Sequence, residues 1–265
     1  MKSRILVSVV GIPVLIAIIL WAPDVVIALA LMILAGIGAY EMMKCVGAAK
    51  EGALLVLTVV AAMLGVLWHY SRPDYITLLW TLYVVAAFIY AIVKAGEVKF
   101  VQILAGIFAA VIIPYSFSAF LRIEATGLHR AYLFLPFILS FACDTFAYFT
   151  GLAIGKHKLA PKVSPKKTIE GSIGGICGNV VCGLLFAFVM GRFLDAGIGY
   201  GAMVILSLCC AVVAQVGDLS FSLIKREFGV KDYGKLFLEH GGVLDRFDSV
   251  LFVTPVIEIV LQMVK

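Results

Sequence analysis

The stretch HGGVLDRFDSVLFVTPVIEIVLQMV, residues 240–264, decides the fold class. It begins with two glycines and three charged residues and is then apolar nearly to its end. About 20 mostly apolar residues are enough to cross a bilayer as a helix. Asp245 and Asp248 lie at the start of this run, where a carboxylate in lipid is costly, so both are candidates for a functional role.

The whole chain has the composition of an integral membrane protein. Of its 265 residues, 63% are hydrophobic and 14% are charged, and the mean hydropathy is +1.10. A soluble domain of this size does not have such a composition. The six cysteines mostly lie inside apolar runs and form no CxxC pair, which favours packing over metal binding. The N-terminal apolar run is too long for a signal peptide and is predicted to be a retained first span.

The apolar runs predict an all-α polytopic membrane protein with about nine transmembrane helices. The expected spans are residues 5–22, 25–43, 53–70, 75–94, 100–122, 131–155, 171–191, 199–224 and 244–264. Basic loops stay cytoplasmic, and the distribution of Lys and Arg predicts the N-terminus inside and the C-terminus outside. The glycines of GSIGGICG, residues 171–178, are spaced for close helix packing. The first five spans carry little buried charge, so the chemistry is expected in the second half.

Two basic cytoplasmic loops are predicted, residues 155–171 and 225–246. In the first, SPKKT at 164–168 places two lysines beside a proline turn and two hydroxyls, next to a predicted helix start. Backbone N–H groups at a helix N-terminus favour anions, so this segment is a candidate phosphate site. A run of lysines also fits a solvated face or attraction to anionic lipid, and that alternative stays open.

Four aspartates, Asp144, Asp218, Asp245 and Asp248, are predicted to lie in the cytoplasmic half of the bundle. Carboxylates that share a small space repel one another unless cations are present. Mg²⁺ prefers oxygen ligands and is typically held by one or two carboxylates together with substrate phosphates. The alternative is that each aspartate pairs with a nearby Lys or Arg, or caps a helix.

Residues 222–249, SLIKREFGVKDYGKLFLEHGGVLDRFDS, closely resemble the signature of the phosphatidate cytidylyltransferase (CDP-diacylglycerol synthase) family. That signature runs S-x-x-K-R, four residues, K-D, and then H-G-G-x-x-D-R-x-D, and every fixed position is met. Residues 144–175 are similar to a second conserved region of the family. The first five spans are similar only in hydropathy.

The resemblance implies that the chain transfers the cytidylyl group of CTP to phosphatidic acid, giving CDP-diacylglycerol and pyrophosphate in phospholipid biosynthesis. It also implies Mg²⁺, with room for a second cation, held by Asp218, Asp245 and Asp248, and by Asp144 as a further ligand or anchor. The catalytic candidates are Asp218, Asp245, Asp248, Lys225 and Arg246. The substrate-binding candidates are Ser164, Lys166, Lys167, Thr168, Lys225, Arg226, Lys231 and His240.

The expected organisation is one membrane unit, in which residues 1–125 serve as scaffold, lipid or dimer contact and residues 131–265 form the catalytic region. The expected location is a bacterial-type inner membrane with the active site facing the cytoplasm. CTP, phosphatidic acid and membrane lipid are the expected partners, a homodimer is compatible with the resemblance, and no nucleic-acid partner is expected.

Two other functions stay open. One is a cytidylyltransferase for another lipid phosphate, such as an isoprenoid-ether phosphate. The other is a secondary transporter or cation channel, because intramembrane aspartates also mark ion pathways. The chain shows no internal repeat of the kind that many transporters have, which disfavours the second.

Overall fold

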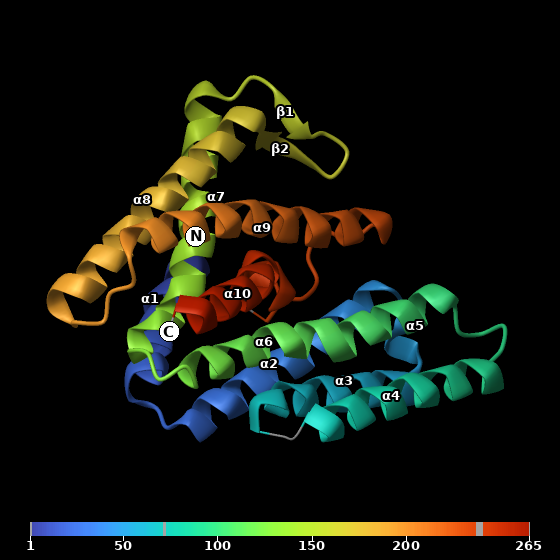
Figure 1. Ribbon diagram of the computed structural model, residues 1–265. Helices are drawn as coiled ribbons and strands as arrows, with labels where there is room; N and C mark the ends of the chain where they lie inside the picture. The colour runs from blue at the N-terminus through green and yellow to red at the C-terminus, as the bar shows by residue number, and fades with distance from the viewer. Residues whose placement is uncertain (1, 71–72, 237–240, 265) are drawn as a thin grey trace. The chain divides into compact units, whose positions relative to one another are not determined.

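A computed structural model describes residues 2–70, 73–236 and 241–264, and within these ranges the chain is helical apart from one short hairpin (Figure 1). The α-helices are α1 (Lys2–Trp21), α2 (Asp24–Cys45), α3 (Gly52–Gly65), α4 (Pro73–Val93), α5 (Phe100–Ile107), α6 (Ile113–Glu124), α7 (Leu135–Ile154), α8 (Ile169–Phe193), α9 (Tyr200–Glu227) and α10 (Leu244–Val264). Short 3-10 turns cover Ala48–Lys50, Val66–Tyr70 and Arg130–Phe134. A π-turn at Phe108–Ile112 joins α5 to α6 just before Pro114, where the missing proline N–H disfavours a regular ladder.

Length and hydropathy make most of these helices able to cross a membrane. Seven helical stretches in the described part of the chain are long and apolar enough, and Gly52–Trp68 is a shorter apolar helix. Large apolar side chains are exposed on them, including Val93 (75%) and Leu152 (72%), as expected for surfaces that face lipid. The predicted helical character is therefore confirmed, and the seven apolar stretches fit a polytopic membrane protein. The count of nine spans and the N-in, C-out orientation stay predictions.

The hairpin is the departure from an all-helical chain. Strand β1 (Lys158–Ala160) pairs antiparallel with β2 (Ser164–Thr168), with Lys158 opposite Thr168 and Ala160 opposite Ser164. The sequence predicts a proline turn at SPKKT, but this segment is an extended strand that leads directly into α8. The Thr168 hydroxyl accepts the N–H of Gly171 at 3.1 Å and caps α8, so the helix begins at Ile169. The hairpin thus lies at the end where α7 stops and α8 starts (Figure 1).

The chain forms two compact units. Unit 1 comprises Met1–Arg122 and Glu227–Arg246, and unit 2 comprises Ile123–Arg226 and Phe247–Lys265. The segment Glu227–Arg246, which carries most of the family signature, therefore packs with the N-terminal helices. The functional division between residues 1–125 and 131–265 stays a prediction.

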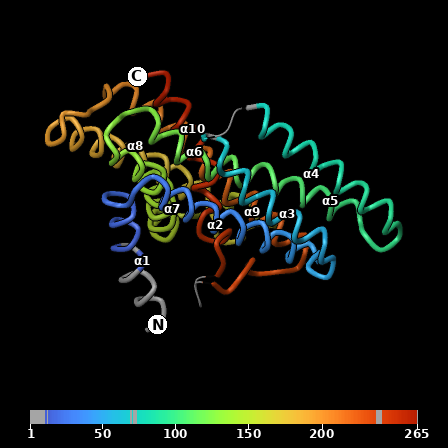
Figure 2. The backbone as a smooth tube through the Cα atoms, turned by 90° about the horizontal axis from the view of Figure 1, so that it is seen from below, coloured from blue at the N-terminus to red at the C-terminus, as the bar shows by residue number. Residues whose placement is uncertain are grey.

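Unit 1 is built around neighbouring helices of the N-terminal half. Helices α2, α3, α4 and α5 run alongside one another in both views (Figures 1 and 2). Their core contains one large buried side chain from each helix, namely Met43, Leu54, Tyr83 and Ile103. Phe228, near the start of the Glu227–Arg246 segment, packs against this core.

Unit 2 contains a helix pair, α7 and α8, that glycines bring into close contact. A Cβ atom added at Gly175 would lie 2.8 Å from the carbonyl oxygen of Cys143, and one added at Gly171 would lie 2.7 Å from that of Ala147. Backbone on the facing helix cannot move aside as a flexible side chain can. The prediction that these glycines serve close helix packing is confirmed.

Adding a methyl group at this contact should destabilise the protein. We expect Gly175→Ala to lower the free energy of unfolding by about 1–3 kcal/mol, because an extra carbon in a filled space forces the backbone apart. Thermal unfolding in detergent measures this. Gly201→Ala in α9 is the matched control, since no described atom lies within 4 Å of its added Cβ, and it should be neutral or stabilising. Equal effects of the two substitutions would contradict the packing role.

Candidate active site

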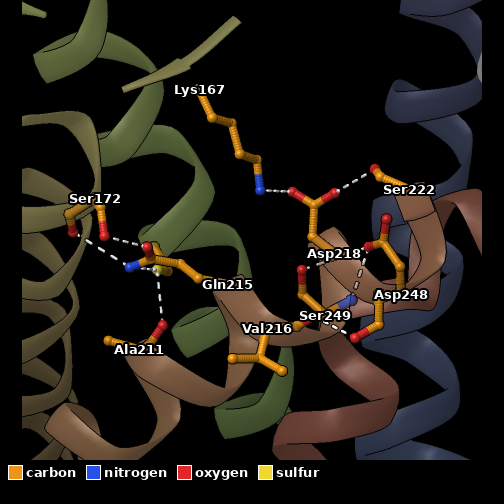
Figure 3. Close-up of polar contacts among 11 residues, drawn as sticks. Lys167, Ser172, Ala211, Gln215, Val216, Asp218, Ser222, Asp248 and Ser249 are labelled. Atoms are coloured by element: carbon orange, nitrogen blue, oxygen red, sulfur yellow. Dashed lines mark hydrogen bonds and ion pairs between the residues drawn. The ribbon is translucent and has the colours of Figure 1, made fainter. Parts of the chain in front are cut away.

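Asp218 is the centre of a polar cluster in unit 2. Gln215, Asp218 and Ser222 lie three and four residues apart on α9, so they share a helix face. Lys167 of β2 extends toward this face, and its ammonium group forms an ion pair with Oδ2 of Asp218 (Figure 3). The Ser222 hydroxyl donates to Oδ1 of Asp218 at 3.3 Å. Both carboxylate oxygens of this intramembrane aspartate are thus compensated by the protein.

A cavity of about 520 Å³ opens beside this cluster within unit 2. The polar residues of its lining are Asp144, Lys158, Lys166, Lys167, Thr168, Ser172, Gln215 and Asp218, and most of the wall area is apolar. This volume is typical of small-molecule sites, which combine an apolar wall with a few polar groups that fix the ligand. The structure thus brings Asp144 of α7, the two lysines of β2 and Asp218 of α9 around one space.

Asp248 lies next to Asp218 (Figure 3). It is half-buried on α10, and its Oδ1 accepts the N–H of Ser249 at 2.7 Å. Asp218 and Asp144 are close enough to repel a charge on Asp248, and Lys225 is close enough to attract it. A Cβ added at Gly217 would lie 2.8 Å from the carbonyl oxygen of Asp248, so glycine lets α9 and α10 approach closely here.

The aspartates of unit 2 fit a cation site that the substrate would complete. No three Asp, Glu, His or Cys side chains among residues 2–70, 73–236 and 241–264 converge closely enough to enclose an ion by themselves. Mg²⁺ does not require this, because it is commonly held by one or two carboxylates together with phosphate oxygens and water. Asp218 and Asp248 are the pair that suits this chemistry, and Asp144 borders the same cavity.

Asp245 has a different setting, in unit 1. Its Oδ2 accepts the N–H of Tyr233 at 2.7 Å and the N–H of Gly242 at 3.0 Å. Between these contacts, Gly241 has a φ of +85°, a left-handed conformation that favours glycine. Asp245 therefore holds the loop that precedes α10, whatever else it binds.

The other predicted binding residues are spread over both units. Arg226 donates from Nε to the carbonyl oxygen of Val163 at 3.3 Å, which ties the end of α9 to the hairpin. Thr168 lines the cavity but uses its hydroxyl as the α8 cap. The positions of the rest are as follows: Ser164 and Lys225 are half-buried in unit 2, Lys231 and Arg246 are exposed in unit 1, and His240 lies outside the described residues.

Gln215 is a cavity residue that sequence reasoning missed. Its Nε2 donates to the carbonyl oxygen of Ser172 at 3.2 Å, and the Ser172 hydroxyl donates to its Oε1. The same Nε2 lies 3.6 Å from the Cys143 sulfur. The amide thus links α7, α8 and α9 at the cavity wall. Its position three residues before Asp218 in an apolar span was the available signal.

Glu41 is a second residue that sequence reasoning missed. It lies on α2 in unit 1 and is only 3% exposed. Its carboxylate accepts the N–H groups of Val243 and Leu244 at the start of α10. Glu41 is thus a buried charge in the second of the five predicted spans that were expected to carry little of it.

Carboxylates and lysines around one cavity among apolar helices are typical of membrane proteins that act on phosphorylated ligands. The chain belongs to the cytidylyltransferase family, whose model matches residues 2–264. The resemblance seen in the signature is thereby confirmed.

Several curated relatives bear the name phosphatidate cytidylyltransferase. Those from Staphylococcus haemolyticus and Staphylococcus aureus are 37% identical over 172 residues, and that from Staphylococcus saprophyticus is 36% identical over the same length. Each alignment covers 65% of this chain and 64% of the relative. The aligned region thus spans just under two-thirds of these relatives.

Removing the lysine charge should destabilise unit 2. The side chains of Lys167 and Asp218 are 26% and 21% exposed, so water offsets part of the lost attraction. We expect Lys167→Met to lower the free energy of unfolding by about 1–2 kcal/mol in detergent. The double variant Lys167→Met/Asp218→Asn should recover most of this loss, because the aspartate charge is gone. Lys166→Met is the matched control, and a loss as large there would show that the ion pair is not the cause.

Proposed function

We propose that this chain is an enzyme that transfers the cytidylyl group of CTP to phosphatidic acid, forming CDP-diacylglycerol and releasing pyrophosphate. Membership of the cytidylyltransferase family and the names of the relatives support this proposal. The observation that carries it is the position of Asp218, which is paired with Lys167 beside a cavity that Lys158 and Lys166 of the hairpin also line. A triphosphate needs both cationic groups and a carboxylate-held cation, and this cavity offers residues for each.

The chemistry needs little from the protein beyond position and charge. An oxygen of the phosphatidate phosphate attacks the α-phosphorus of CTP in line, and a new P–O bond forms. The bond from the α-phosphorus to the bridging oxygen of the β-phosphate breaks, and pyrophosphate leaves with that electron pair. Because the nucleophile is already an anion, no strong general base is required. Positioning and charge neutralisation then supply most of the rate.

The lysines of β2 suit the phosphates. Lys166 is exposed at the cavity and is free to move, whereas Lys167 starts from its ion pair with Asp218. Lys225 in unit 2 is a further candidate, together with Arg226, Lys231, Arg246 and His240 of the signature. In this proposal Ser164 and Thr168 contribute through the hairpin and the cap of α8.

Mg²⁺ is the proposed cofactor, with room for a second cation. Asp218 and Asp248 are the proposed ligands in unit 2, with Asp144 as a further ligand or anchor. Asp245, in the first turn of α10, is the proposed ligand from the family signature. The segment of the signature that precedes α10, Glu227–Val243, is called the signature loop below. When bound, the ion would neutralise charge on the triphosphate and on the leaving pyrophosphate. The protein would contribute fixed carboxylates, and Lys167 would balance Asp218 when the ion is absent.

The proposed setting is a bacterial-type inner membrane, with nine spans, the N-terminus inside and the site open to cytoplasmic CTP. The lipid substrate would come from the bilayer. The cavity wall that includes Tyr148 and Leu152 suits acyl chains, because these side chains are 65% and 72% exposed on apolar helices. A homodimer stays a prediction.

Asp218→Asn should abolish most of the activity. Purified protein in detergent with phosphatidic acid and radiolabelled CTP should give Mg²⁺-dependent, lipid-extractable label. We expect the variant to lose at least about 100-fold in rate, because a carboxylate that acts on transition-state charge is removed. Asp195→Asn is the matched control, since Asp195 is exposed in a loop of unit 2 and asparagine tolerates its positive φ.

The same assay tests the choice of acceptor. Label with an isoprenoid-ether phosphate but not with phosphatidic acid would replace the proposed acceptor. No label with either lipid in a folded protein would contradict the enzymatic proposal and favour ion transport. Equal activity of Asp218→Asn and wild type would remove Asp218 from the site.

Lys166→Gln should weaken CTP binding more than it slows the chemistry. We expect the KM for CTP to rise about 10-fold with little change in kcat, because a charge-assisted contact to phosphate is lost in substrate and transition state alike. Steady-state kinetics at two salt concentrations measure this, and the difference should shrink at high salt. Lys162→Gln, exposed in the hairpin turn and not in the cavity lining, should leave the KM unchanged. A larger effect at Lys162 would point to general attraction rather than a site.

A further inference from the structure

Glu41 makes two bonds to the start of α10 from a helix early in the chain. Its Oε1 accepts the N–H of Val243 at 3.0 Å, and its Oε2 accepts the N–H of Leu244 at 2.9 Å. The contacts join positions 202 and 203 residues apart, both within unit 1. Val243 and Leu244 are fully buried, so water cannot replace the carboxylate.

Two glycines of the signature loop are pressed against the same carboxylate. A Cβ atom added at Gly234 or at Gly242 would overlap the Glu41 carboxyl group. Neither glycine has a positive φ, so backbone conformation does not require glycine at these positions. The requirement comes from the close approach of Glu41. Two separate points of the loop therefore converge on one side chain.

Glu41 and Asp245 divide the backbone donors of this region between them. Asp245 takes the N–H groups of Tyr233 and Gly242, and Glu41 takes those of Val243 and Leu244. The donors that Glu41 takes lie at the start of α10, where N–H groups have no partner inside the helix itself, whereas those that Asp245 takes belong to the preceding loop. Negative charge at this end also suits the helix dipole. The loop and the helix start are thus fixed by two carboxylates from opposite ends of the chain.

Helix stability alone does not explain this arrangement. The α8 helix of the same protein is capped locally by Thr168, which is sufficient to satisfy a helix start. The Glu41 carboxylate satisfies the donors at the start of α10 and, because it belongs to α2, also fixes where α10 begins relative to α2. Asp245 is the second residue of α10, and Asp248 follows three residues later in the same helix.

We infer that Glu41 is a positioning residue, which holds the signature loop and the first turn of α10 so that Asp245 is presented in a fixed orientation. The inference rests on the proposed function, since orientation of Asp245 matters to turnover only if that residue acts on the substrates. Glu41 itself touches neither substrate. Its loss should therefore slow the chemical step more than it weakens CTP binding.

Glu41→Gln tests the inference with almost no change in shape. The amide oxygen can accept one N–H, but its NH₂ group then faces the other donor. At a temperature where all variants are folded, we expect kcat to fall about 10- to 100-fold, while the KM for CTP changes less than about 3-fold. Trypsin should also cleave faster after Lys231 or Lys235, which are exposed in the loop.

Glu51→Gln is the matched control. Glu51 also belongs to unit 1, and its carboxylate accepts a hydrogen bond from the Tyr90 hydroxyl at 2.9 Å. Among the described residues, it forms no hydrogen bond with the loop. It should keep wild-type kinetics and wild-type cleavage. Gly234→Ala disturbs the same contact from the loop. It should also lower kcat, leave the KM for CTP nearly unchanged and speed up cleavage by trypsin.

The outcomes distinguish a failure of this inference from a failure of the proposed function. Wild-type kcat and cleavage in Glu41→Gln would overturn the inference and leave the proposed function standing. Equal losses of kcat in Glu41→Gln and Glu51→Gln would show that Glu41 contributes only to general stability, and this would also overturn the inference. A wild-type protein that makes no CDP-lipid would overturn the proposed function, and loop cleavage would then still decide whether Glu41 orders the loop.

Discussion

Charge buried among apolar helices has to be compensated inside the protein, because lipid offers no hydrogen bonds and no ions. Three carboxylates of this chain meet that constraint in two ways. Asp218 is balanced by an ammonium group and a hydroxyl, and it remains beside a cavity. Glu41 and Asp245 are balanced by backbone N–H groups, which cannot move away from them. In the proposed function the ion pair of Asp218 gives way to a substrate or an ion, whereas the backbone contacts of Glu41 and Asp245 stay in place.

The exchangeable pair depends on the fixed structure around it. Lys167 is placed by the β2 strand, whose end is anchored by the Thr168 cap of α8. The α8 helix in turn lies against α7 because glycine removes the side chains that would separate them. Arg226 ties the same hairpin to the end of α9, the helix that also carries Asp218. The positions of β2, α8 and α9 therefore bring the Lys167 side chain to the Asp218 carboxylate.

Hydropathy was enough to predict the helices, because an apolar run of about 20 residues can satisfy its own backbone hydrogen bonds in a bilayer by forming a helix. The signature was enough to predict the family, whereas Asp218 and Lys167 were noticed as a carboxylate within an apolar span and as a lysine of a basic loop. The hairpin was not predictable, because a lysine- and proline-rich segment of five residues has no alternation that marks a strand. The role of Glu41 was not predictable either. Its partners are backbone N–H groups more than 200 residues away, and every residue except proline has such a group, so no residue type in the sequence identifies them. Gln215 could have been found, since an amide one turn from an intramembrane aspartate is unusual.

The crowding of Gly234 and Gly242 against Glu41 has a consequence for how such chains can be recombined. Positions 41, 234 and 242 form one steric unit, although they are distributed between the two ends of the sequence. A chimaera that joins the first helices of one relative to the signature of another inherits half of this unit from each parent. Its loop would order only where the incoming helix brings a carboxylate of the same length and the incoming loop brings glycine at both positions. These three positions are therefore one place where the two halves have to match.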